Sequence, residues 1–170
     1  MRPQDIVVLM KLISTKGRDI TNRQIAIELG ISASEVSEAL ERCRIARLVD
    51  DKKKQVNTLA FQEFLEHGLK YVFPIIPGRS VRGIPTGVSA SPIKEKISSD
   101  RDVFVWPDST GNIRGYAVTP LYKTVPEAVK SDEILYKLLV IGDTFRIGRS
   151  REVEVAKSEL QTIINKYNAR

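Results

Sequence analysis

Short hydroxyl side chains and cations, gathered between residues 21 and 54, are the groups of this sequence best suited to chemistry. Ser32, Ser34 and Ser37 lie close together in the chain, and Lys52, Lys53 and Lys54 form a basic run. Hydroxyl groups donate or accept hydrogen bonds at phosphates and at base edges, and ammonium groups neutralise phosphates. This combination indicates contact with a nucleic acid rather than a chemical reaction.

Catalysis and metal binding find little support, because Cys43 is the only cysteine and His67 the only histidine. These counts exclude a disulfide within the chain and a Cys/His zinc site. With one cysteine and one histidine, few of the common catalytic pairs of a nucleophile and a base are possible. The sequence also has no glycine motif that binds phosphates or dinucleotides. We therefore expect no enzyme activity, no cofactor and no metal. Cys43 is expected to lie in the core as a small apolar side chain.

Two short helices joined by a turn are predicted for TNRQIAIELGISASEVSEAL, residues 21–40. Thr21 is followed three residues later by Gln24, and Ser32 is followed in the same way by Glu35. In each pair the first side chain can cap a helix and the second can bind back to it, which is the pattern of a capping box. The sequence therefore marks the start of both helices.

Ala26, Gly30 and Val36 meet the steric needs of such a pair: a small residue where the helices touch, a glycine in the turn and a β-branched residue in the core. Here the sequence resembles the helix-turn-helix of bacterial transcription regulators, whose second helix enters the major groove of DNA. Apolar positions over residues 3–14 predict a preceding helix, with Pro3 in its first turn.

A polar turn at residues 51–54 separates two short extended segments, 48–50 and 55–57, and this pattern predicts a small basic hairpin. Three helices followed by such a hairpin resemble the winged helix-turn-helix fold, in the order found in MarR-like regulators. The resemblance covers residues 1–70 and implies that the lysines of the hairpin lie along the DNA backbone or in the minor groove. A further helix, capped by Asn57 or Thr58, is expected to follow.

The expected contacts with DNA lie on both helices and on the hairpin. Ser34 and Ser37 face outward on the second helix and favour DNA. Glu38 and Glu41 share this face and count against DNA, because phosphates repel carboxylates. These glutamates can instead pair with arginines three or four residues later, so an ordinary solvated helix face is the alternative. The candidate contacts are Thr21, Asn22, Arg23, Ser32, Ser34, Ser37, Arg42, Lys52, Lys53 and Lys54.

Composition fits one large or two small globular domains: the chain has 170 residues, of which 42% are hydrophobic and 28% charged. The formal net charge of +6 is divided equally between residues 1–57 and 58–170, so folding would have to create any basic patch. No apolar run approaches the length of about 20 residues that spans a bilayer. Asp5 interrupts any apolar segment of a signal peptide, and we expect a cytoplasmic protein.

Beyond residue 70 the sequence changes to short β-prone pieces between proline, glycine and serine residues. The predicted strands are 71–76, 81–84, 103–106 and 113–118. The last two, separated by a polar loop, are typical of a hairpin. Residues 89–100 are predicted to form an exposed loop or a flexible linker.

Two helices close the chain and are expected to form a helical hairpin or a surface for a partner. The first is predicted to begin near Ser131 and to end at Gly148, and the second follows directly. Around their junction, Arg146, Arg149 and Arg151 concentrate positive charge that could bind phosphate or an acidic partner. A solvated turn is the alternative.

The sequence thus predicts an α+β protein, with a winged helix-turn-helix domain at residues 1–70 and a region of β-hairpin and helical hairpin at 71–170. We expect a sequence-specific transcription regulator that binds double-stranded DNA as a homodimer, since the regulators it resembles generally dimerise. The second region would then serve dimerisation, sensing or partner binding. The alternative function is a protein-interaction module, such as an autoregulating antitoxin or an adaptor. An enzyme with an accessory winged domain is least favoured, and no membrane partner is expected.

Overall fold

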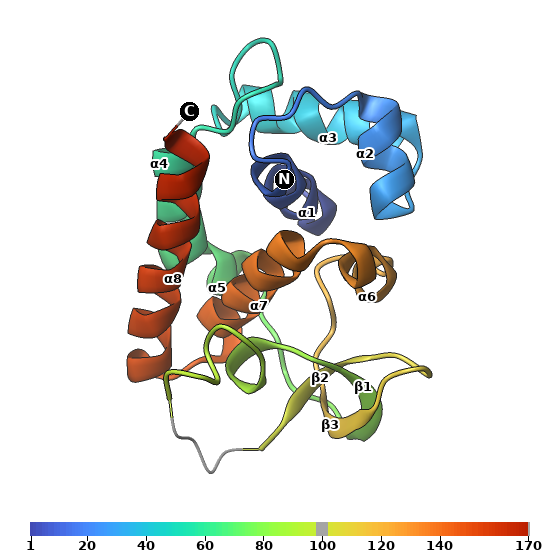
Figure 1. The fold of residues 1–170 in the computed structure, drawn as a ribbon, viewed down its shortest axis with the longest axis vertical. Coiled ribbons are helices and arrows are strands. Elements are labelled where there is room, and N and C mark those ends of the chain that lie inside the picture. Colours follow the sequence, from blue (N-terminus) through green and yellow to red (C-terminus); the bar gives the residue numbers. More distant parts are fainter. Residues whose placement is uncertain (98–101, 170) are drawn as a thin grey trace.

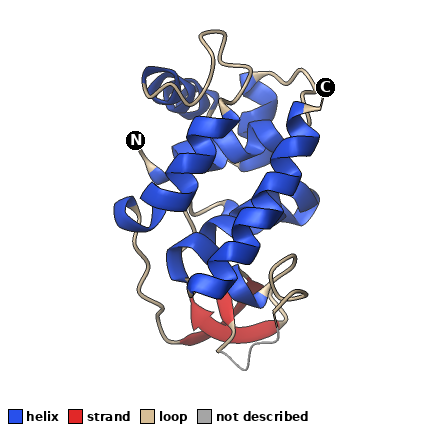
Figure 2. Ribbon diagram, turned by 90° about the vertical axis from the view of Figure 1, so that its left-hand side faces the viewer, coloured by secondary structure: helices blue, strands red, loops and turns tan. Residues whose placement is uncertain are grey.

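The computed structural model describes residues 1–97 and 102–169, and it has the α+β composition that the sequence predicts. Figure 1 shows a body of helices with a small sheet at one end, and Figure 2 shows the same division from the side. The helices are α1 (Pro3–Ser14), α2 (Asn22–Leu29), α3 (Ala33–Ile45), α4 (Thr58–Glu63), α5 (Leu69–Val72), α6 (Val125–Ala128), α7 (Glu133–Ile147) and α8 (Ser150–Asn168). The strands are β1 (Ser80–Pro85), β2 (Phe104–Pro107) and β3 (Ile113–Ala117).

Helix α1 lies inside the helical part of the molecule (Figure 1), and apart from Asp5, Lys11 and Ser14 its buried side chains are apolar. Every side chain from Asp5 to Ser14 is buried. The helix packs against α3 on one side and against α7 on the other. Helices α2 and α3 therefore share a continuous hydrophobic cluster with α7 and α8. The division of the chain into two domains near residue 70 stays a prediction.

A helical run follows residue 57, where the Asn57 side chain accepts a hydrogen bond from the backbone of α4. Helix α4 continues through a π-helical turn at Phe64–Gly68 into α5. The predicted strand at 71–76 is wrong, because this run extends to Val72 and irregular structure follows it. The buried face of the run consists of Phe61, Leu65 and Leu69.

The polar turn after α3 is a tight reversal of the chain. Val49 and Val56 form an isolated antiparallel bridge, and Asp50 N donates to Gln55 O at 2.9 Å. The Asp50 carboxylate also accepts from the backbone N–H groups of Lys54 and Gln55, at 2.7 and 2.8 Å. The two extended segments predicted here are thus present as a bridge rather than as strands.

The sheet closes on itself, because each of its three strands pairs with the other two (Figure 1). Strand β1 runs antiparallel to both partners: Gly83–Pro85 pair with β2, and Ser80–Gly83 pair with β3. Strands β2 and β3 are consequently parallel to each other. The strands predicted at 81–84, 103–106 and 113–118 are confirmed, but the hairpin predicted for the last two is wrong.

Only residues 108–112 join β2 to the parallel strand β3, and glycines explain how so short a connection is possible. A Cβ atom at Gly83 would collide with the carbonyl oxygen of Trp106, and one at Gly111 would collide with the backbone of Gly83. A Cβ at Gly115 would lie 2.5 Å from the carbonyl oxygen of Val103. The backbones therefore approach more closely than side chains would permit, and the chain can cross β1 between β2 and β3.

The segment after β1 is anchored to the core rather than exposed. Ala90 and Ile93 are 3% and 0% exposed, so the prediction of an exposed linker is wrong for this part of residues 89–100. Residues 98–100 of that prediction lie outside the described residues. The segment thus helps to cover α7, against which its first turn packs.

The two closing helices are confirmed. Asp132, one residue later than predicted, caps α7 by accepting a hydrogen bond from Leu135 N at 2.9 Å. Helix α7 ends at Gly148, as predicted, and α8 returns along it as the second arm of a helical hairpin. The C-terminal end of α8 reaches the base of the polar turn near α4 (Figure 1).

Candidate nucleic-acid interface

The two capping boxes that the sequence predicts hold α2 and α3 at their first turns. Thr21 Oγ1 accepts from Gln24 N at 3.2 Å, and Gln24 Oε1 accepts from Thr21 N at 2.9 Å. Ser32 and Glu35 make the equivalent pair at 3.1 and 2.9 Å. Gly30 joins the helices with a φ of +65°, a conformation that costs glycine little. The orientation of α3 relative to α2 is thereby set by local bonds.

Helix α3 has one anchored side and one open side. Val36, Leu40 and Cys43 are at most 1% exposed and fix the helix in the core, as predicted. Burial raises the pKa of the Cys43 thiol to about 12, which keeps it protonated and unreactive. Ser34 and Ser37 are exposed on the opposite side. The helix cannot turn these hydroxyl groups away without exposing its apolar side.

The hydroxyl groups of the candidate residues differ in whether they already make hydrogen bonds within the protein. Those of Thr21 and Ser32 already take part in the capping boxes. Within residues 1–97 and 102–169, the side chains of Ser34 and Ser37 make no hydrogen bond, and Asn22 and Arg23 are exposed in the first turn of α2. The open candidates are thus the two serines of α3 and the start of α2.

Cations of the same chain neutralise the carboxylates on the open side of α3. Glu41 binds Arg44 at 2.7 Å and Lys53 at 2.6 Å, and hydrogen bonds from these two side chains lower the pKa of Glu41 to about 2. Glu38 lies 3.7 Å from Arg42. The pairs predicted within α3 are confirmed, and Lys53 adds a bond between α3 and the polar turn.

Arg42 mainly serves the interior rather than the surface. Its Nε and Nη2 atoms donate to both carboxylate oxygens of Asp5, at distances of 2.7 to 3.2 Å. Asp5 is fully buried in α1, and its hydrogen bonds raise the pKa of Arg42. This geometry does not favour the expected contact of Arg42 with DNA, because two of its nitrogen atoms already bind a buried carboxylate.

The three lysines of the polar turn are not equivalent. Lys53 binds Glu41, and Lys54 binds Asp19 at 2.7 Å. Lys52 is exposed and makes no ion pair with any residue that the structure describes. An incoming phosphate would meet Lys52 directly, whereas at the other two lysines it would have to replace a carboxylate.

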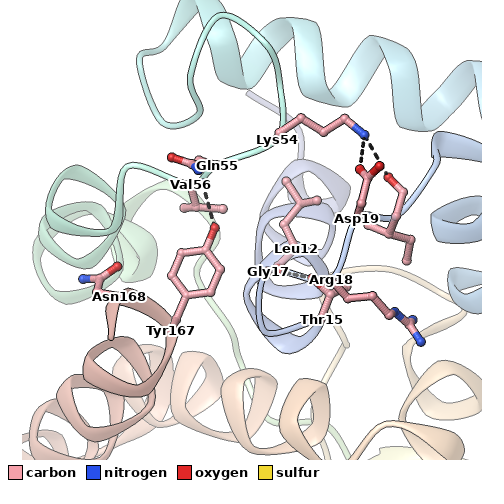
Figure 3. A pocket seen from close by; sticks show the side chains of 11 residues that line it. Leu12, Thr15, Gly17, Arg18, Asp19, Lys54, Gln55, Val56, Tyr167 and Asn168 are labelled. Carbon is pink, nitrogen blue, oxygen red and sulfur yellow. Dashed lines mark hydrogen bonds and ion pairs between the residues drawn. The ribbon is translucent and has the colours of Figure 1, made fainter. Parts of the chain in front are cut away.

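A cavity of about 360 Å³ lies behind the polar turn (Figure 3). Leu12 and Val56 give it an apolar floor, and Arg18 and Lys54 stand at its rim. Tyr167 of α8 forms a wall, where its hydroxyl oxygen accepts a hydrogen bond from Val56 N at 3.2 Å. The cavity thus connects the end of α8 with the turn that carries the lysines.

Arg146 does not join the predicted basic cluster at the start of α8. Its side chain is 5% exposed and binds the buried Asp143 at 2.8 Å, while Arg149 and Arg151 are exposed. Burial raises the pKa of Asp143 and lowers that of Arg146, and their mutual attraction opposes both shifts. The same carboxylate accepts hydrogen bonds from Trp106 Nε1 and Thr86 Oγ1. Arg146 therefore stabilises the junction of α7 with the sheet.

The ion pairs of the buried Lys11 were also not foreseen from the sequence. Lys11 of α1, 5% exposed, lies 2.5 Å from Glu28 of α2 and 2.6 Å from Asp132 at the start of α7. The available signal was the presence of Asp5 and Lys11 in an otherwise apolar helix, because buried charges need partners. The identity of those partners required the tertiary structure.

Two classes of feature are missing from the part of the chain that the structure describes. None of its helices is long and apolar enough to cross a membrane. It also holds no group of three or more His, Cys, Asp or Glu side chains placed to bind a metal ion.

Comparison with protein-family models, with curated proteins and with solved structures gives no match to this chain.

Proposed function

We propose that this protein is a sequence-specific DNA-binding transcription regulator, in which residues 1–70 form a winged helix-turn-helix domain similar to that of MarR-like regulators. Helix α3 reads base edges in the major groove through Ser34 and Ser37. The polar turn, with Lys52 at its tip, lies along the DNA backbone. The protein acts in the cytoplasm on double-stranded DNA, and a homodimer matches two-fold symmetric half-sites.

The observation that carries this proposal is the open side of α3. Two adjacent turns of the helix each present a serine hydroxyl that has no partner among the described residues. Both are held in a fixed direction by the buried side of the same helix. A rigid element with free hydroxyl groups suits recognition of base edges, because little ordering is needed on binding.

The ion pairs around α3 are compatible with this function. Exposed pairs such as that of Lys54 and Asp19 contribute only about 0–1 kcal/mol. A phosphate can therefore replace the carboxylate at little cost. Arg23 on α2 and Lys52 on the polar turn need no such exchange, and they provide phosphate contacts.

The test is a fluorescence anisotropy titration of the protein with duplexes from its own upstream region and with a scrambled duplex. Ser34→Ala and Ser37→Ala should each weaken specific binding by about 1–3 kcal/mol and leave scrambled DNA unaffected, because base contacts carry the specificity. Ser158→Ala on the exposed side of α8 is the control and should bind as the parent does.

Two outcomes would contradict the proposal. A folded parent that binds no duplex even at low salt would remove the DNA-binding function. Serine variants that keep the specificity of the parent would show that α3 is not the reading helix.

A protein-interaction module, such as an autoregulating antitoxin or an adaptor, is the second candidate. It is favoured by Ile27 on α2 and Ile45 on α3, which are 72% and 69% exposed. Exposed apolar side chains of this size suit a protein partner better than a phosphate backbone. Co-purification of a stoichiometric protein partner that prevents duplex binding would support this candidate over the first.

A further inference from the structure

The segment Tyr122–Thr124, from the second half of the chain, lies against the first turn of α3. The Tyr122 hydroxyl donates to Glu35 Oε1 at 3.1 Å. A Cβ atom on Gly30 would lie 3.5 Å from Thr124 Cγ2. Helix α6, which follows this segment, packs against α2. Figure 1 shows α6 beside α2, although the two are far apart in the sequence.

Lys123 stands between these two contacts and is exposed. It forms no hydrogen bond or ion pair with the residues that the structure describes. Hydrogen bonds from Ser32 lower the pKa of Glu35, with smaller contributions from Tyr122 and from the charge of Lys123. Lys123 thus lies in the chain between two residues that contact the start of α3, while the Glu35 carboxylate is occupied by its capping box.

A cation next to the first turn of a reading helix is suited to contact a DNA phosphate. Ser34 belongs to the same helical turn as Glu35, and a helix advances only about 5.4 Å per turn. The major groove is about 12 Å wide, roughly the diameter of a helix, so backbone phosphates flank a helix that enters it. A cation beside the first turn of α3 would thus meet the backbone next to the bases that Ser34 contacts.

We infer that the second half of this chain takes part in the DNA interface directly, with Lys123 binding a backbone phosphate next to the base pairs read by α3. Tyr122 and Thr124 hold this lysine in place through Glu35 and Gly30. The inference rests on the proposed function. It adds a phosphate contact that neither α2, α3 nor the polar turn supplies, from a region expected only to dimerise, sense or bind a partner.

The test measures duplex binding by the full chain between about 50 and 200 mM salt. Each phosphate contact adds about 0.9 to the slope of log affinity against log salt, so Lys123→Ala should lower the slope by about that amount. Lys123→Arg should keep the slope. Lys130→Ala is the matched control, because Lys130 lies in the turn Val129–Ser131 after α6, in ion pairs with Glu127 and Asp108. It should bind as the parent does.

An unchanged slope for Lys123→Ala, with a parent that binds DNA, would overturn the inference and leave the proposed function intact. A parent that binds no duplex would overturn the proposed function first. An equal loss of slope for Lys130→Ala would also overturn the inference, because it would show a general effect of positive charge. Thermal unfolding of each variant checks that the exposed substitutions leave the fold unchanged.

Discussion

Arg42 and Arg44 are neighbours on α3, yet they belong to two different regions of the molecule. Arg42 turns inward and binds Asp5, which is fully buried in α1. Arg44 turns outward and binds Glu41 and Asp51, whose side chains are 41% and 96% exposed. The same residue type thus forms a fixed pair beneath the helix and an exchangeable pair on its surface.

The lysines show the same contrast. Lys11, 5% exposed, connects α1 to the start of α7 through Asp132, whereas Lys54, 51% exposed, binds Asp19 in solvent. Breaking a buried pair leaves a charge without solvation, but an exposed pair can change partners. We infer that the inner pairs hold the elements in place and that the outer pairs are available to a ligand.

Loss of an inner pair should have the largest effect. Asp143→Ala leaves the buried guanidinium of Arg146 without its carboxylate and should lower the free energy of unfolding by about 3–5 kcal/mol. Asp51→Ala removes an exposed pair and should change it by no more than about 0.5 kcal/mol. Urea unfolding measures both, and equal losses would remove the distinction between the two regions.

Acid should weaken the inner pair at α7. Burial alone raises the pKa of Asp132, but Lys11, Ser14 and the N–H group of Leu135 together lower it below its ordinary value of 3.8. A lowered pKa in the folded state stabilises the protein above about pH 4, and this stability is lost as pH falls through the folded value. The difference in unfolding free energy between parent and Asp132→Asn should therefore shrink between pH 7 and pH 3.

The exposed Asp19 is the control for this pH series. Asp19→Asn should differ little from the parent at any pH, since its carboxylate is 87% exposed. If the difference between parent and Asp132→Asn were the same at pH 3 as at pH 7, the ion pair with Lys11 would not be the source of the stability.

Lys52 and Lys54 of the polar turn should contribute unequally to DNA binding. Lys52→Ala should lower the salt slope by about 0.9, because Lys52 has no carboxylate partner among the described residues. Lys54→Ala should lower it less, because binding of a phosphate by Lys54 frees Asp19 to attract counterions. Salt titrations of both variants measure the two slopes. The reverse order would show that the intramolecular pair does not persist in solution.

The smallest predicted effect is a gain in affinity for DNA. Glu41→Gln removes a carboxylate from the open side of α3 and frees Lys53 and Arg44, so DNA binding should tighten by about twofold to fivefold. Because the pKa of Glu41 is about 2, this gain should be constant between pH 5 and pH 8. Anisotropy titrations test it, with Glu154→Gln on α8 as the control. Weaker binding would mean that Glu41 itself contacts the ligand.

Much of the helical structure could be predicted because its signals are local. The capping boxes at Thr21 and Ser32, the positive φ of Gly30 and the cap at Asn57 all occur where the sequence predicts them. Each of these signals involves residues three or four positions apart, which the folding of the rest of the chain does not alter. The buried side of α3 follows from the same helical periodicity.

The sheet and the arginines were predicted less well. Strand propensity identified the segments that become β2 and β3, but a short polar loop between strands suggested a hairpin. The contacts of Gly83 and Gly111 that allow parallel strands here involve β1, which lies far earlier in the chain. Arg42 and Arg146 were assigned to the surface, since basic residues are usually exposed and no local pattern reveals a buried carboxylate partner.

The sequence by itself determined the two capped helices, the turn between them, the preceding apolar helix and the serines on the open side of α3. These features depend on backbone and side-chain preferences within a few residues. Only the tertiary structure decided the direction of β3, the inward bonds of Arg42 and Arg146, and the contact of Tyr122 with α3. Those outcomes depend on which distant segments share the core, and the free energy of such contacts is not written in any local stretch of the chain.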